Sequence, residues 1–123
     1  MAVPATIKLL VIDDDTEDRR LVRDWLDDAS RVNFSIGESA SAEEGIVKLE
    51  KGRFDVVLLD YRMPDKDGLW VLDKMKELRL QVPVVIVTSH GDRNIQNTAF
   101  EKGAADYLEK GTFTSELLER TCL

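Results

Sequence analysis

The sequence predicts an α/β fold in which a parallel sheet of five strands is covered by helices on both faces. Five short apolar runs alternate with five stretches whose apolar residues recur at the helical period. Single helices between strands require right-handed crossovers and hence a parallel sheet. With 123 residues, of which 43% are hydrophobic, the chain can fill one core, and we expect a single domain over 1–123.

The five expected strands differ in how apolar they are. The runs over 7–12, 54–59 and 82–88 are nearly continuous in apolar residues, which is typical of strands covered on both faces. The runs over 32–36 and 105–109 alternate apolar with polar residues, as edge strands do. This difference places the first, third and fourth strands in the middle. It favours the order 2-1-3-4-5, a flavodoxin-like (βα)5 three-layer sandwich.

The expected helices are defined by apolar residues spaced three or four positions apart. They cover residues 16–29, 42–51, 67–79, 93–102 and 113–121. Their apolar faces consist of Leu21, Val22, Trp25 and Leu26; Ile46 and Leu49; Leu69, Leu72, Met75 and Leu78; Ile95 and Ala99; and Phe113, Leu117 and Leu118. The fourth helix has the weakest face, which is typical of an element with low local stability.

Small polar residues and glycines mark the expected helix ends. An N-cap needs a short side chain with an oxygen, and a helix often stops at a glycine. The candidates are Asp15 or Thr16 for the first helix, Ser39 or Ser41 for the second, and Gly52 and Gly103 after the second and fourth.

The composition limits the functional classes. A net charge of −7 disfavours direct binding of nucleic acid and suits a cation or a basic partner. One cysteine, Cys122, allows no disulfide within the chain, so we expect a reducing, cytoplasmic location. No apolar run approaches ~18 residues, which argues against a membrane span. The N-terminal MAVPATIK also lacks the pattern of a secretory signal.

Polar side chains follow four of the predicted strands. Because ligands bind outside the carboxyl ends of the strands in such sheets, these side chains should meet at one edge. They are Asp13, Asp14 and Asp15 after the first strand, Asp60 at the third, Thr88 and Ser89 at the fourth, and Lys110 after the fifth.

This set of side chains predicts phosphoryl chemistry. Clustered carboxylates repel one another unless a cation is present, and Mg²⁺, or Mn²⁺, prefers oxygen ligands and retains waters. Lys110 and the Thr88 hydroxyl can hold further oxygens of a phosphoryl group. Asp60, central and ionised, is then placed as an in-line nucleophile. The pattern indicates a site that accepts a phosphoryl group on an aspartate.

Four ordered motifs carry a resemblance to a known family. The stretches VIDDD (11–15), LLDYRMPDKDG (58–68), VVIVTS (84–89) and GAADYLEKG (103–111) resemble the receiver domain of two-component response regulators, including chemotaxis receivers. The resemblance covers essentially the whole chain. One departure is Gly111, since the family usually has proline directly after the lysine.

The resemblance implies a role for each matching residue. Asp60 would be the phosphoacceptor, Asp14 a direct Mg²⁺ ligand and Asp13 a ligand through water. The backbone carbonyl of Arg62 would be a further Mg²⁺ ligand. Thr88 and Lys110 would contact the phosphoryl group, and Tyr107 would be the switch aromatic. Arg62, Ser89 and His90 stand near the site, where each side chain either tunes the phosphoryl lifetime or is merely solvated.

The resemblance also implies partners. The donor would be a phosphohistidine on a sensor histidine kinase or a histidine phosphotransfer protein. The surface formed by 93–102, 105–109 and 113–121 would change its affinity for a partner, and a homodimer through it is an open alternative. Such a protein catalyses only its own phosphorylation and dephosphorylation, so we do not expect an enzyme acting on other substrates.

Two other functions remain as alternatives. An aspartyl phosphatase on a related fold usually carries a second acid two residues after its nucleophile, but that position is Arg62 here. A degenerate receiver would fold and bind partners without being phosphorylated. The full set of acidic, hydroxyl and lysine residues argues against it.

Overall fold

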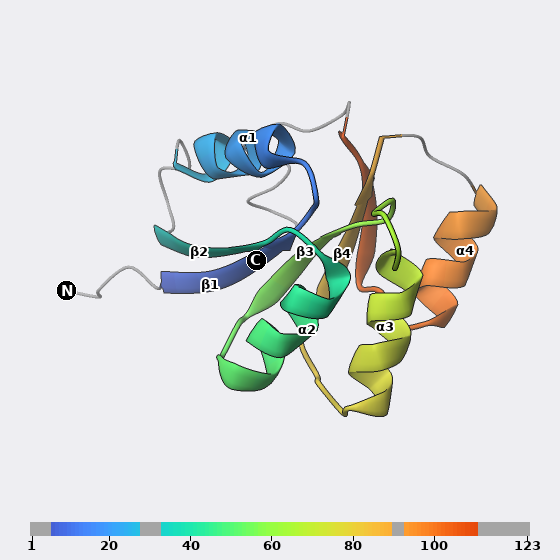
Figure 1. Ribbon diagram of the computed structural model, residues 1–123. Coiled ribbons are helices and arrows are strands. Elements are labelled where there is room, and N and C mark those ends of the chain that lie inside the picture. Colours follow the sequence, from blue (N-terminus) through green and yellow to red (C-terminus); the bar gives the residue numbers. More distant parts are fainter. Residues whose placement is uncertain (1–5, 28–32, 90–92, 111–123) are drawn as a thin grey trace.

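The computed structural model describes residues 6–27, 33–89 and 93–110 (Figure 1). The expected helix over 113–121, together with His90, Gly111 and Cys122, lies outside the described residues. The elements are β1 Thr6–Ile12, α1 Thr16–Asp27, β2 Asn33–Ser39, α2 Ala42–Lys51, β3 Val56–Asp60, α3 Gly68–Glu77, β4 Val84–Thr88, α4 Arg93–Glu101 and β5 Asp106–Glu109.

The five strands form one parallel sheet in the order β2-β1-β3-β4-β5, which confirms the predicted order. Every residue of β3 and β4 is buried, whereas no residue of β5 is fully buried. The contrast between central and edge strands that the sequence indicated is therefore real. It arises because central strands are covered on both faces.

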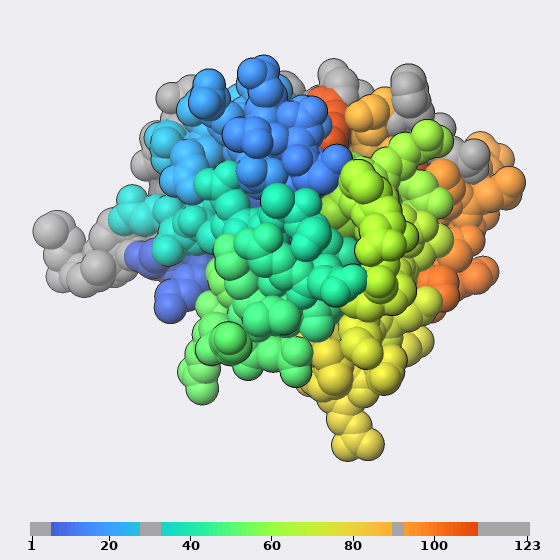
Figure 2. Space-filling view, in the orientation of Figure 1, coloured from blue at the N-terminus to red at the C-terminus, as the bar shows by residue number. Residues whose placement is uncertain are grey.

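The helices divide between the two faces of the sheet. Figure 1 shows α1 on one face and α2, α3 and α4 on the other. One core cluster packs α1 against Leu9, Val11 and Leu58, and the other packs the remaining helices against Leu10 and Leu59. Figure 2 shows α2 and α3 side by side across the surface of this second layer. Among the described residues, no helix is long and apolar enough to cross a membrane.

Two helices pack somewhat differently from the sequence pattern. In α1, Val22 and Leu26 are buried, but Leu21 is 46% exposed. In α3, Val71 is completely buried although it was not in the expected stripe. Leu78, expected in that stripe, is the C-cap residue of α3 and is exposed.

Local side-chain chemistry fixes the helix ends. Asp15 Oδ1 accepts from the Glu17 backbone N–H at 2.8 Å, and Ser41 Oγ accepts from the Glu44 N–H at 3.2 Å. Both N-caps were among the candidates. After α4, Gly103 takes a φ of +103°, a conformation that glycine reaches without strain.

The contact between α2 and β1 leaves no room for a side chain at Gly45. A Cβ there would meet Ile12 Cδ1 and would lie 2.8 Å from Ile12 Cγ1. Ile12 is itself completely buried in the core. The absence of a side chain at Gly45 therefore lets α2 approach the strand that leads into Asp13.

We expect Gly45→Val to lower the free energy of unfolding by about 1–3 kcal/mol, because the added methyls overpack Ile12. Urea denaturation measures this change. Glu50→Val is the matched control, since Glu50 is exposed on the same helix, and we expect a change within about 0.5 kcal/mol. Equal effects of the two variants would contradict the close-packing account.

Candidate functional site

Four side chains that the sequence singled out converge at the carboxyl ends of the strands. Asp13 follows β1, Asp60 and Thr88 are the last residues of β3 and β4, and Lys110 follows β5. Asp13, Asp60 and Thr88 are only 4%, 6% and 1% exposed. The parallel arrangement therefore buries two carboxyl groups and a hydroxyl at one edge of the sheet.

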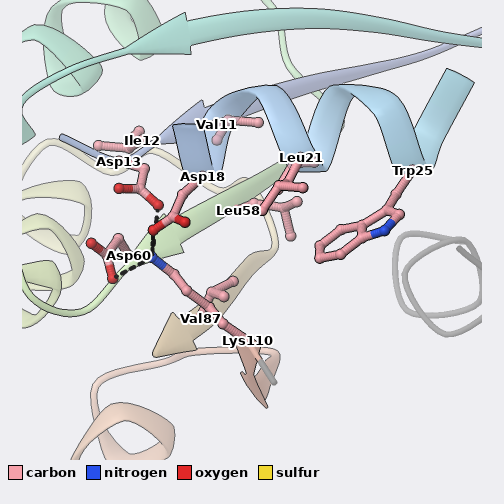
Figure 3. Close-up of a pocket in the computed structure, with 11 residues that line it drawn as sticks. Val11, Ile12, Asp13, Asp18, Leu21, Trp25, Leu58, Asp60, Val87 and Lys110 are labelled. Carbon is pink, nitrogen blue, oxygen red and sulfur yellow. Dashed lines mark hydrogen bonds and ion pairs between the residues drawn. The ribbon is translucent and has the colours of Figure 1, made fainter. Parts of the chain in front are cut away.

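Lys110 links the acidic side chains (Figure 3). Its Nζ donates hydrogen bonds to Asp13 Oδ2 at 3.0 Å and to Asp18 Oδ2 at 2.6 Å, and it forms an ion pair with Asp60 Oδ1 at 3.5 Å. Sequence reasoning missed Asp18. The available signal was its position in the first turn of the helix that begins next to Asp13 and Asp14.

The electrostatics follow from burial and from like charge. Burial, followed by the negative charge of Asp13, raises the pKa of Asp60 to about 7, while Lys110 and the Arg62 backbone amide oppose this shift. Burial also raises the pKa of Asp13. Burial opposes the charge of Lys110, but its hydrogen bonds to Asp18 and Asp13 raise the Lys110 pKa overall. Among the described residues, the one ammonium of Lys110 thus faces the three carboxyl groups of Asp13, Asp18 and Asp60.

Three carboxylates could share a cation. One oxygen from each of Asp13, Asp14 and Asp60 lies within 4.8 Å of the other two. Asp14 is exposed, so an ion can reach the cluster from solvent. An all-oxygen donor set of carboxylates that repel one another fits Mg²⁺ or Mn²⁺. Arg62, expected to contribute its backbone carbonyl, directly follows this edge of the sheet, and its side chain is exposed.

The loop that carries Asp13 is held by several polar contacts. The Asp15 N–H donates to Asp13 Oδ1 at 2.9 Å, so that each oxygen of Asp13 has a donor. The Arg19 guanidinium donates to the Asp13 backbone carbonyl at 2.6 Å and to Glu38 Oε1 on β2 at 3.1 Å. Both the carboxyl group and the backbone of Asp13 are therefore fixed in orientation.

A close backbone approach shapes the other side of the site. A Cβ at Gly68 would lie 3.0 Å from the Asp60 carbonyl oxygen and 3.1 Å from Tyr61 Cα. The Gly68 N–H donates to the Tyr61 carbonyl at 2.9 Å, and Asp67 caps α3 through the Trp70 N–H at 3.0 Å. The backbone after Asp60 thus turns back, so that the start of α3 packs directly against Asp60 and Tyr61.

The remaining candidate residues surround this centre. Tyr107 is half-buried on β5 and packs against the core cluster that contains Ala99 of α4. Ser89 is exposed just beyond Thr88. His90 lies outside the described residues.

Asp13, Asp18, Asp60 and Lys110 form the polar end of a pocket of about 60 Å³ whose apolar wall includes Trp25 (Figure 3).

Comparison with known proteins identifies relatives of the whole described fold. Residues 9–121 match the family described as the response regulator receiver domain. The chain is 36% identical over 114 residues to transcriptional regulatory protein CiaR of Streptococcus pneumoniae, covering 93% of this chain and 49% of that protein. It is 43% identical over 108 residues to protein-glutamate methylesterase/protein-glutamine glutaminase 2 of Methanosarcina acetivorans, covering 85% and 30%.

A solved structure supports the same relationship. The chemotaxis protein CheY4 of Vibrio cholerae superposes with a TM-score of 0.83 at 27% identity, covering 95% of this chain and 96% of that one. The curated relatives are longer, and this chain spans about half the length of the transcriptional regulators that it matches.

The raised pKa of Asp60 predicts a pH-dependent stability. The folded chain keeps the Asp60 proton up to about pH 7, whereas the unfolded chain loses it near 3.8, so the contribution of Asp60 to stability falls as pH rises between these values. Asp60→Asn has no charge to bury. In chelator, we expect the free energy of unfolding of Asp60→Asn to rise relative to that of the parent by about 2–3 kcal/mol from pH 5 to pH 8.

Urea denaturation at pH 5, 6, 7 and 8 measures this difference. The control is Asp24→Asn, which replaces an exposed acid on α1 and so removes no buried charge. A loss of stability in Asp60→Asn at pH 8 would show that the buried carboxylate is compensated, contrary to the electrostatic account.

Proposed function

Because the chain belongs to the response regulator receiver domain family, we propose that it accepts a phosphoryl group on Asp60 from a phosphohistidine. The family places it in two-component signalling. The observation that carries the proposal is the position of Asp60, which is buried at the end of β3, 3.5 Å from the Lys110 ammonium and within a cluster of three carboxylates.

The transfer is a displacement at phosphorus. An oxygen of Asp60 attacks, a P–O bond forms, the P–N bond to the donor imidazole breaks, and its electron pair returns to the ring. The Lys110 ammonium stands where it can bond an oxygen of the transferred group. The Thr88 hydroxyl, at the neighbouring strand end, can bond another.

The donor set supports a resident Mg²⁺ or Mn²⁺ ion. Asp13, Asp14 and Asp60 would hold it, with the Arg62 backbone carbonyl as a further ligand. When bound, the ion neutralises charge on the phosphoryl oxygens. The protein's own contribution is to fix Asp13 through Arg19 and Asp15, and so to keep the ligand set in place.

Thr88 and Tyr107 are the residues through which the signal would leave the site. A phosphoryl group that draws the Thr88 hydroxyl toward Asp60 changes the space next to β5, and Tyr107 then turns inward. The neighbouring elements are weakly anchored, since Ala99 is the single buried residue of α4 in the structure. A local charge change can therefore bias two arrangements of this surface.

The partners follow from this role. The donor is a sensor histidine kinase or a histidine phosphotransfer protein, and the surface of α4, β5 and the segment after β5 is the output, with homodimerisation as one use of it. Direct nucleic-acid binding is not part of the proposal, because the chain carries a net charge of −7. CiaR is a transcriptional regulator by name, but this chain covers only 49% of it.

We expect incubation with Mg²⁺ and acetyl phosphate to add one phosphoryl group, and intact-mass spectrometry measures it. The gain should be absent in Asp60→Asn and abolished by a chelator, since Asp60 is the acceptor and the acidic cluster needs its cation. No gain in the parent would instead support a degenerate receiver, and turnover of a generic phosphate ester would support a hydrolase.

Phosphorylation should also change amide hydrogen exchange over residues 93–110 in the parent. Thr88→Ala should still be phosphorylated, but with a much smaller change in exchange, because the hydroxyl that couples Asp60 to β5 is missing. Hydrogen-exchange mass spectrometry with and without acetyl phosphate compares the two. Unchanged exchange in the phosphorylated parent would refute the switch while leaving phosphorylation itself intact.

A further inference from the structure

Asp18 is the nearest partner of Lys110 in the structure. Its Oδ2 lies 2.6 Å from Lys110 Nζ, compared with 3.0 Å for Asp13 and 3.5 Å for Asp60. An ammonium has three donors, and within the described part of the chain this one donates to Asp13 and Asp18. The lysine that should bond a phosphoryl group on Asp60 is thus held by a residue outside the acidic cluster.

The carboxylate of Asp18 has different surroundings from those of the other acids at the site. Asp13, Asp14 and Asp60 can share one cation, but Asp18 does not belong to that group among the described residues. Its side chain is 30% exposed, whereas the Asp60 side chain is 7% exposed. Among the described residues, Lys110 is the cation that pairs with Asp18, and Asp18 loses this partner when Lys110 turns to another anion.

We propose that Asp18 restrains phosphorylation by competing with the phosphoryl group on Asp60 for the Lys110 ammonium. The proposal rests on the proposed function, since it concerns the regulation of the same site. A phosphoryl group brings up to two negative charges next to Lys110. Asp18 both occupies a donor of Lys110 and repels the incoming group. Asp18 is then a positioning residue that sets how readily the receiver is switched on.

The first test is the initial rate of phosphorylation by acetyl phosphate, measured by intact mass at saturating Mg²⁺ so that ion affinity does not contribute. We expect Asp18→Asn to be roughly three- to tenfold faster than the parent, the size of one partly exposed charged hydrogen bond. Asp18→Glu keeps the carboxylate and should restore a rate near that of the parent.

Glu17→Gln is the matched control. Glu17 precedes Asp18 in the same helical turn and is exposed, and among the described residues it forms no ion pair. Its rate should stay within about twofold of the parent, since it removes the same charge without releasing Lys110. An equal acceleration in Glu17→Gln, or a rate in Asp18→Asn no higher than that of the parent, would overturn the competition.

The second test is a crystal structure of Asp18→Asn, which does not depend on phosphorylation. Released Lys110 should move to within about 3.2 Å of Asp60 Oδ1, a hydrogen-bonding distance. A Lys110 that keeps its present place would overturn the restraint. If the parent gains no phosphoryl group, the proposed function fails. If the parent is phosphorylated but Asp18→Asn behaves like it, only the role of Asp18 fails.

Discussion

The burial of Asp60 beside Asp13 is the constraint on which the rest of this structure depends. Two carboxyl groups at the end of a covered sheet are unfavourable unless positive charge is supplied. Lys110 supplies it from the far strand, and with the exposed carboxylate of Asp14 the two acids form a group that could hold a cation. The same constraint that raises the pKa of Asp60 makes the site receptive to a metal ion and to an anion that the ion and Lys110 can share.

Much of the surrounding packing serves to keep this unfavourable arrangement in place. Arg19 ties the backbone of Asp13 to Glu38 on the edge strand β2, and Gly68 lets α3 start against the backbone of Asp60. Gly45 brings α2 onto Ile12, the residue before Asp13. These contacts come from opposite layers of the sandwich. The position of the two acids is therefore a property of the whole sheet and not of one loop.

Rigidity is unevenly distributed around the site. β1, β3 and β4 reach it as buried strands, whereas β5 and α4 contribute few buried residues. Lys110 stands at the end of this less buried side, and its shortest contact is with Asp18 on α1. One side of the site is thus well buried and the other less so, a difference that the proposed charge-driven switch would use.

The sequence by itself determined the fold and most of the site. Apolar runs that differ between central and edge strands specify the strand order, and acids, a hydroxyl and a lysine at strand ends specify the edge where they meet. It also limited the first two N-caps to two candidates each, among them Asp15 and Ser41, because capping is local chemistry. Only the tertiary structure decided that Lys110 bonds Asp18, that Val71 faces the core and that Leu21 does not. Such facts depend on how a helix is rotated and where it lies on the sheet, and periodicity leaves both free within about one position.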